Sequence, residues 1–207
     1  MFTDRAEAGE QLAERLAERG VEADVVLGIT RGGMPVARVV ADRLDCPLGA
    51  VVVQKIGTPG REELALGAVT SDGTAWLNRD LVHDLGVDES VFTNRREQAE
   101  AQAAEKATRY RDENPPLDLA GKRVLVVDDG VATGATACAA LASARERGAS
   151  EVVLGVPVGA SSSMERLRGE ADEVVCLELP EPFGAVGRHY ERFEQVNDED
   201  VRAALGG

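Results

Sequence analysis

Two adjacent aspartates, Asp128 and Asp129, follow an apolar run, "VLVV" (124–127), that predicts a buried strand. At the end of such a strand two like charges repel each other and lose hydration, so both carboxylates need partners. Vicinal sugar hydroxyls would suit them, because a carboxylate accepts short charge-assisted hydrogen bonds. In the alternative interpretation, one carboxylate caps the following turn and the other stays in water. The two residues alone leave both interpretations open.

The residues that follow the aspartates favour a ligand. Residues 132–136, "ATGAT", combine small side chains with consecutive backbone N–H groups where a helix is predicted to begin. A helix N-terminus binds phosphate through such groups and through the helix dipole. The stretch has neither the Gly-Lys-Ser/Thr of a nucleoside-triphosphate loop nor a G-x-G-x-x-G fingerprint. The carboxylates could accept hydrogen bonds from a diol, and the neighbouring N–H groups could bind a phosphate. Together they predict a site for a phosphorylated ribose.

The elements that must position this site alternate between strands and helices. Five apolar runs predict strands, and amphipathic or alanine-rich stretches separate most of them; the runs are residues 25–30, 50–56, 123–129, 151–158 and 172–179. Because these runs are rich in valine and lack period-two alternation, they predict a parallel sheet covered on both faces. Ligands bind such sheets beyond the carboxyl ends of the strands, where Asp128 and Asp129 lie.

Two segments do not fit the simple alternation. "LALGAVT" and "TAWLN" flank "SDG", which predicts an antiparallel hairpin. Residues 88–113 predict a charged helix with little apolar face, ended by Pro115 and Pro116. The predicted organisation is therefore a single domain over residues 1–207. It has a core at about 20–180, an insertion of hairpin and helix at about 57–116, and a C-terminal segment from about 180.

The composition of the chain argues against several classes of function. The net charge is −14, from 37 acidic and 23 basic residues, and only Lys55, Lys106 and Lys122 are lysines. Such a surface repels phosphate backbones and argues against nucleic-acid binding. No apolar run approaches the roughly 20 residues that cross a bilayer, and the acidic start is not a signal peptide. Three scattered cysteines fit a reducing compartment, so we expect a cytoplasmic protein without membrane contact.

"VLVVDDGVATGAT" (124–136) resembles the phosphoribosyl-pyrophosphate motif of the type I phosphoribosyltransferases. Gly130 departs from the motif, because the family usually has a branched aliphatic residue there. The resemblance implies an α/β fold with a doubly wound parallel sheet of five strands and a small C-terminal hood (180–207). It also implies contacts to phosphoribosyl pyrophosphate from Asp128, Asp129, Gly130, Val131, Ala132, Thr133, Gly134, Ala135 and Thr136.

The resemblance places further functional loops in order along the chain. "TRGG" (30–33) corresponds to the pyrophosphate loop, in which Arg31, Gly32 and Gly33 would contact the diphosphate and the Thr30–Arg31 peptide bond is expected to be cis. In the mobile catalytic loop after the second strand, Lys55 and Arg61 would neutralise the leaving group. The implied catalytic residues are Asp128, Asp129, Arg31, Lys55 and Arg61.

The hood segment "PEPFGAVGRHYERF" (180–193) resembles that of purine-using members. We expect Phe183 to pack on the nucleobase, because a flat aromatic face suits a flat base. Tyr190 and Phe193 fit equally well as a small core of the hood. Ala132 and Ala135 differ from the hypoxanthine–guanine pattern, so a purine-like acceptor is favoured but its identity is open. The charged helix at 88–113 is more typical of an uncharacterised subgroup of phosphoribosyltransferase-like proteins.

The function implied by the resemblance is transfer of a phosphoribosyl group from phosphoribosyl pyrophosphate to a nitrogenous base. Mg²⁺ would be held mainly by the ligand's diphosphate, with Asp128 or Asp129 reaching it through water. Two alternatives are a sensor that binds phosphoribosyl pyrophosphate or a nucleotide without turnover, and a hydrolase or phosphorylase of a ribosyl phosphate. A homodimer is common in the family, and the sequence does not establish one here.

The acidic, lysine-poor composition also suggests a protein from a high-salt cytoplasm. If so, raising the salt concentration from low to molar should raise the temperature of thermal unfolding, because salt screens repulsion among the excess carboxylates. Thermal unfolding followed by circular dichroism at both concentrations measures this. An unfolding temperature that is equal or higher at low salt would contradict the halophilic interpretation.

Overall fold

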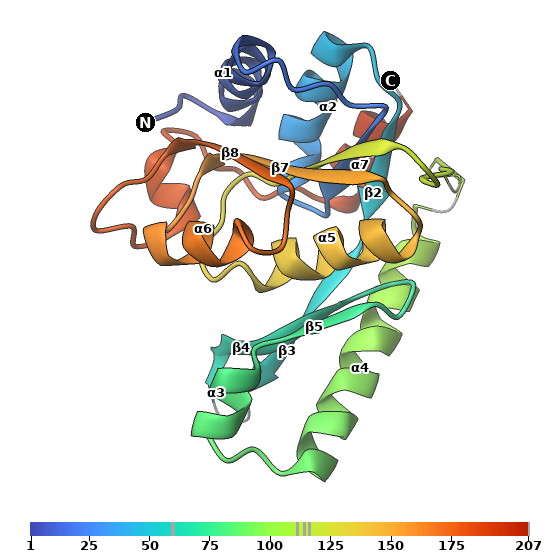
Figure 1. Ribbon diagram of the computed structural model, residues 1–207, viewed down its shortest axis with the longest axis vertical. Helices are drawn as coiled ribbons and strands as arrows, with labels where there is room; N and C mark the ends of the chain where they lie inside the picture. The colour runs from blue at the N-terminus through green and yellow to red at the C-terminus, as the bar shows by residue number, and fades with distance from the viewer. Residues whose placement is uncertain (59–60, 111, 114, 116, 207) are drawn as a thin grey trace.

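The computed structural model describes residues 1–206 except 59, 60, 111, 114 and 116, and for residues 61–64 it describes the backbone alone. Five parallel strands form the central sheet in the order β2-β1-β6-β7-β8 (Figure 1). Their bounds are β1 (Val25–Ile29), β2 (Leu48–Val51), β6 (Arg123–Val127), β7 (Glu151–Val158) and β8 (Glu173–Glu178). This arrangement confirms the predicted five-stranded parallel sheet.

Helices cover both faces of this sheet, as the apolar strands require. On one face lie α1 (Arg5–Glu18), α2 (Gly33–Leu44) and α7 (Asp198–Leu205), and on the other lie α5 (Ala135–Glu146) and α6 (Ser161–Leu167) (Figure 1). In α1 the residues Ala8, Leu12 and Leu16 form an apolar stripe that is fully buried. Each layer buries a valine- and alanine-rich core against the strands, and this burial is the main stabilising contribution to the fold.

A second sheet extends away from the first and contains β3 (Val53–Thr58), β4 (Arg61–Thr70) and β5 (Ala75–Leu77) in antiparallel order (Figure 1). The turn between β4 and β5 closes where Thr70 N–H donates to the Thr74 carbonyl, so the predicted hairpin is confirmed. One face packs on α5 and the other on α4 (Glu89–Thr108), through Ala99 among others. A short helix not predicted from the sequence, α3 (Arg79–Asp84), connects β5 to α4.

The single strand predicted at 50–56 is wrong, because the chain divides there between the two sheets. β2 ends at Val51, opposite Ile29 of β1, and β3 begins at Val53, opposite Thr70 of β4. Val52 lies between them, buried with only 2% of its surface exposed, and its carbonyl accepts from Ser71 N–H. The sequence does not indicate this change of partner, because the valines before and after it are equally apolar.

The charged helix also differs from its prediction of 88–113. α4 begins at Glu89 and ends at Thr108, before Pro115, while Pro116 lies outside the described residues. Tyr110 then turns inward and is 1% exposed. The aromatic ring therefore anchors the end of α4 to the body of the molecule, against α7 and β2 rather than in solvent.

A search of the described residues for a helix long and apolar enough to cross a bilayer finds none. The longest helix, α4, is rich in charged residues and has two buried alanines, Ala99 and Ala103.

Candidate functional site

The site forms where β1 and β6 end side by side in the central sheet. Asp128 and Asp129 follow β6, and each is only 8% exposed. The loop 30–33 follows β1 and begins α2. Its Thr30–Arg31 peptide bond is cis, as predicted. The parallel pairing of Gly28 with Val127 brings the ends of the two strands together, so residues about 100 apart in sequence become neighbours.

Loop 30–33 lies directly against the two aspartates, and this contact requires glycine. A β-carbon at Gly33 would stand 2.8 Å from the Asp128 α-carbon and 2.8 Å from the Val127 carbonyl oxygen. A β-carbon at Gly32 would collide with the Asp129 carboxylate. The absence of side chains therefore lets the loop backbone approach the carboxylates, which joins two of the predicted ligand-binding segments into one surface.

Asp129 carries an ion pair that the sequence did not suggest. Arg5, the first residue of α1, contacts its Oδ2 with Nε at 2.9 Å and Nη2 at 2.8 Å. Both side chains are nearly buried, at 11% and 12% exposure. Tyr190 adds a hydrogen bond of 2.6 Å to the Asp129 carbonyl. The N-terminal helix and the C-terminal segment therefore both hold Asp129.

Arg5 is itself held on three sides. Its Nη1 donates to the Glu194 carbonyl at 2.7 Å, and its guanidinium carbon stands 3.9 Å from the centre of the Phe193 ring. A cation over an aromatic face is attracted to it. No local motif marks Arg5 as functional, because its partners lie 124 and 189 residues away.

The electrostatics of the two carboxyl groups differ. Burial raises the pKa of Asp128, and the neighbouring charge of Asp129 raises it further, while the Asp129 N–H and the charge of Lys55 oppose this. Burial also raises the pKa of Asp129, but the Arg5 guanidinium opposes it by charge and by hydrogen bonding. Asp129 is therefore the more readily ionised member, and Asp128 is the group that a ligand or cation would most strongly affect.

The predicted phosphate loop continues from the aspartates into α5. Gly134 takes a left-handed conformation (φ +82°) as the residue before the helix, and no side chain caps the helix among the described residues. From α6, Ser163 donates to the Ala132 carbonyl at 2.6 Å and Arg166 to the Thr133 carbonyl at 3.0 Å. The carbonyls of the loop are thus engaged, and the N–H groups of the first helical turn can receive an anion.

Gly130 is required by the hood. A β-carbon there would lie 2.6 Å from Val186 Cγ1 and 2.9 Å from Val158 Cγ1. The departure from the family motif therefore has a steric reason, because Val186 occupies the space that a branched side chain at 130 would need. The following residue, Val131, is buried and bridges to Gly159 beyond β7.

The remaining predicted residues take different places. Phe183 is partly buried against the cluster that contains Val158 and Tyr190, and its ring centre lies 5.2 Å from that of His189. Lys55 is exposed on β3, and its charge acts on Asp128. The guanidinium of Arg31 is directed to Asp198 of α7, at 3.6 Å from Nη1 to Oδ1. The side chain of Arg61 lies outside the described residues.

A cavity of about 350 Å³ adjoins loop 30–33. Its lining consists of the two arginines of the site, one loop glycine and a stretch of the C-terminal segment: Arg5, Arg31, Gly32, Phe193, Glu194, Gln195 and Val196. Its volume lies within the range of small-ligand pockets. Two guanidinium groups and the backbone of the loop make it suited to an anion.

Comparisons with known proteins identify the family of the chain. Residues 3–191 match the family described as "Phosphoribosyl transferase domain". TT1426 from Thermus thermophilus is 44% identical in sequence and has a TM-score of 0.84, over 99% of this chain and 97% of that one. AQ2163 from Aquifex aeolicus has a TM-score of 0.52 at 12% identity, over 84% of this chain and 72% of that one, which is a likeness of fold alone.

A curated relative from Mycobacterium tuberculosis, strain H37Rv, bears the name "Putative phosphoribosyl transferase Rv0571c". It is 45% identical over 205 residues, which are 99% of this chain and 46% of the relative. The protein named MT0597 from strain CDC 1551 matches to the same extent. This chain therefore spans about half the length of the curated relatives that it matches.

The buried pair of Arg5 and Asp129 yields a stability prediction. Arg5→Gln should lower the free energy of unfolding at neutral pH by about 3 kcal/mol, because it leaves a buried carboxylate without its cation. Without Arg5 the pKa of Asp129 rises further, so the folded variant protonates this group more readily. Its loss of stability should therefore be smaller in mildly acidic solution, should grow as the pH rises toward that pKa, and should level off above it.

Urea unfolding of Arg5→Gln and the unchanged protein, at neutral and mildly acidic pH, measures the effect. Arg15→Gln is the matched control on the same helix, because Arg15 pairs with Glu18 on the exposed surface. Equal, small losses for both variants at both pH values would contradict the assigned role of Arg5.

Proposed function

The chain belongs to the phosphoribosyl transferase family, and we propose that it transfers the phosphoribosyl group of phosphoribosyl pyrophosphate to a nitrogenous base. The observation that carries this proposal is the junction of two loops at the ends of β1 and β6. At Gly32 and Gly33 the backbone approaches Asp128 and Asp129 closely. The chain continues from the two aspartates into the N-terminus of α5, which no side chain caps among the described residues. In this proposal, N–H donors for a phosphate and carboxylate acceptors for a diol lie next to each other. Space for a diphosphate adjoins them at loop 30–33.

In this proposal Asp128 and Asp129 orient the ribose. Within the described residues, hydrogen bonds from protein donors engage Oδ1 of Asp128 and Oδ2 of Asp129. The two side chains also hydrogen-bond to each other, and in this proposal ribose hydroxyls would donate to the carboxylates in place of that contact. Hydroxyl donors would also favour the ionised form of Asp128, against the burial that raises its pKa.

The phosphoryl groups would lie at the two ends of this diol site. Residues 132–136 would bind the 5′-phosphate through backbone N–H groups at the start of α5. The diphosphate would lie at loop 30–33, where the cavity of about 350 Å³ is lined by Arg5 and Arg31. Lys55 would add positive charge from β3, and Arg61 remains a proposed contact from the adjoining loop.

The residues of the chain fit Mg²⁺ only as secondary contacts. No group of three or more His, Cys, Asp or Glu side chains suited to a metal ion exists among the described residues. We therefore propose that the diphosphate brings the ion and that Asp128 or Asp129 reaches it through water. Mg²⁺ would neutralise charge on the leaving group.

The reaction exchanges one bond at ribose C1 for another. The bond from C1 to the pyrophosphate oxygen breaks and its electron pair leaves with pyrophosphate, while a nitrogen of the base forms the new bond to C1. Asp128 and Asp129 would hold the ring in place, and the cations beside loop 30–33 would stabilise the charge that develops on the leaving oxygen. The chain would contribute chiefly positioning and charge.

The acceptor would lie beneath the hood. Val186 lies against Gly130, so this part of the hood covers the segment directly after the aspartates. Phe183 packs against the same buried cluster as Val186, which supports its proposed contact with a flat, purine-like base. The tilted ring of His189 stands behind it, with Nε2 at 2.9 Å from the Phe183 carbonyl oxygen.

The proposal predicts pyrophosphate release from phosphoribosyl pyrophosphate in the presence of Mg²⁺ and one base. A panel of purine and pyrimidine bases, assayed for pyrophosphate release and for the nucleotide product, measures this. Release in the absence of any base would instead indicate a hydrolase. Binding of phosphoribosyl pyrophosphate without release would indicate a sensor.

The assigned role of the aspartates has its own test. Asp128→Asn and Asp129→Asn should each weaken binding of phosphoribosyl pyrophosphate by about tenfold or more, the effect of losing charge-assisted hydrogen bonds. Isothermal titration measures the affinity, and circular dichroism checks the fold. Asp80→Asn, an exposed position on α3, is the control. Unchanged affinity in both aspartate variants would remove them from the ribose site.

A further inference from the structure

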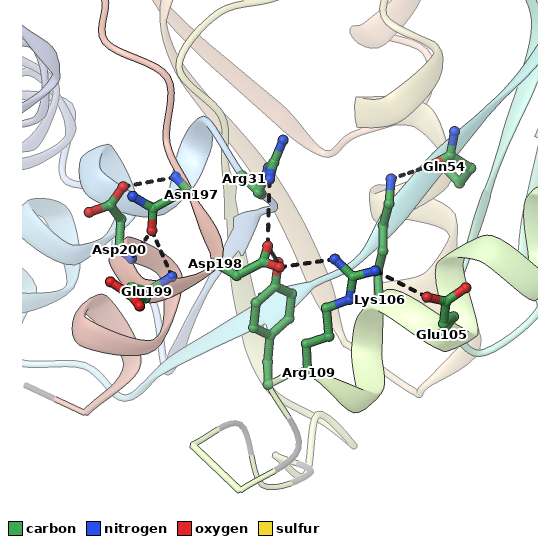
Figure 2. A network of polar contacts seen from close by, with 10 residues as sticks. Arg31, Gln54, Glu105, Lys106, Arg109, Asn197, Asp198, Glu199 and Asp200 are labelled. Atoms are coloured by element: carbon green, nitrogen blue, oxygen red, sulfur yellow. Dashed lines mark hydrogen bonds and ion pairs between the residues drawn. The ribbon is translucent and has the colours of Figure 1, made fainter.

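A polar cluster joins the proposed pyrophosphate loop to two distant helices. Asp198, the first residue of α7, stands at its centre (Figure 2). Its Oδ1 accepts from the Tyr110 hydroxyl at 2.6 Å and lies 3.6 Å from Arg31 Nη1. Its Oδ2 accepts from Arg109 Nη1 at 3.0 Å. One carboxylate therefore connects the loop after β1, the end of α4 and the start of α7.

The cluster is anchored on its apolar side. Tyr110 is 1% exposed and packs with Met34 of α2, Val52 between the two sheets and Val201 of α7. Burial raises the pKa of Tyr110 to about 12, and its hydrogen bond to Asp198 adds to the rise. At neutral pH the phenol is thus a fixed donor, and it points the Asp198 carboxylate toward Arg31.

Asp198 also stands at an ordered helix start. Asn197 caps α7 by accepting from the Glu199 and Asp200 N–H groups, and Asp200 accepts in return from Asn197 N–H (Figure 2). The hydrogen bonds from Tyr110 and Arg109 lower the pKa of Asp198, so its charge is present at neutral pH. The position and the charge of the carboxylate are therefore set before any ligand arrives.

The cations of the cluster repel one another. The pKa of Lys106 is lowered by burial and then by the charges of Arg31 and Arg109, and Lys106 Nζ donates to Gln54 at 2.6 Å. With Asp198 as the central anion, these three cations can remain close to one another. Without it, the Arg31 side chain would be expected to move away from Lys106 and Arg109, toward solvent.

We propose that Asp198 is a positioning residue that fixes Arg31, and with it the pyrophosphate loop, in the arrangement that receives the diphosphate. This inference rests on the proposed function. On its other side the loop is fixed by the contacts of Gly32 and Gly33 with the two aspartates. Asp198 supplies the second fixed point, through a side chain instead of the backbone. A loop held at both ends loses less freedom when the diphosphate binds.

The short hydrogen bonds from Tyr110 and Arg109 hold the Asp198 carboxylate in place, and its longer contact is the one with Arg31. Arg31 is 44% exposed and its ion pair with Asp198 is long, so this contact adds little to folding. Its geometric effect is larger, because Arg31 directly precedes the two glycines of the loop. Loss of the contact between Arg31 and Asp198 should therefore alter ligand affinity more than unfolding temperature.

The test measures affinity for phosphoribosyl pyrophosphate with Mg²⁺ by isothermal titration. Asp198→Asn should raise the Kd about tenfold, while Asp198→Glu, which keeps the charge, should restore much of the affinity. Asp200→Asn is the matched control, since Asp200 lies in the same helical turn and serves only the cap among the contacts described. Its Kd should stay within about twofold of the unchanged protein.

A double-mutant cycle with Arg31→Gln separates positioning from a structural role. If Asp198 acts through Arg31, the effect of Asp198→Asn should largely disappear in the Arg31→Gln background. An effect of equal size in both backgrounds would overturn the proposal. Tighter binding by Asp198→Asn would also overturn it, because Asp198 would then hold Arg31 away from the ligand.

Three further outcomes are decisive. If Asp198→Asn does not fold, Tyr110→Phe removes the phenol donor and keeps the buried ring, and it should raise the Kd about threefold; an unchanged Kd would overturn the proposal. If the unchanged protein binds no phosphoribosyl pyrophosphate, the proposed function itself fails. Normal binding by the unchanged protein and by every Asp198 variant would defeat the positioning role alone.

Discussion

The buried carboxylate of Asp129 is the constraint on which the arrangement of the whole site depends. A carboxylate that is 8% exposed beside a second one is strongly unfavourable unless cations and donors surround it. The chain supplies Arg5 from its first helix, and Arg5 is held in turn by the Glu194 carbonyl and the Phe193 ring. Both ends of the chain must therefore reach β6, and the site closes only when the N-terminal helix and the C-terminal segment have docked.

Close backbone approach is the second requirement, and it explains three of the glycines around the candidate site. Gly32 and Gly33 let the loop after β1 touch the aspartates, and Gly130 lets Val186 of the hood lie against the segment after β6. Each of these contacts joins two segments that are distant in the sequence. A side chain at any of the three positions would separate the two halves of the site rather than merely crowd them.

The sequence predicted the parts of the site that are local and missed those that are long-range. The aspartate pair and the predicted phosphate loop follow from contiguous residues whose types are informative together, and the cis Thr30–Arg31 bond follows from the family resemblance. Arg5 and Asp198 carry no such signal, because an arginine or aspartate in an acidic, arginine-rich chain is ordinary until its partner is known. The division of residues 50–56 between two sheets was missed for a related reason, since a uniform run of valines does not show where the strand partner changes.

The distribution of charge explains how a molecule of net charge −14 can suit an anion. Arg5 and Arg31 line one cavity, Lys55 acts on Asp128, and Lys106 and Arg109 gather around Arg31, so two of the three lysines serve this region. Salt screens the repulsion that an incoming anion meets at a distance, because the Debye length is only about 3 Å at 1 M. Short contacts with a nearly buried group such as Arg5 are screened much less. A high-salt environment would therefore weaken the general repulsion and preserve the local attraction, which makes the acidic surface compatible with the proposed phosphorylated ligand.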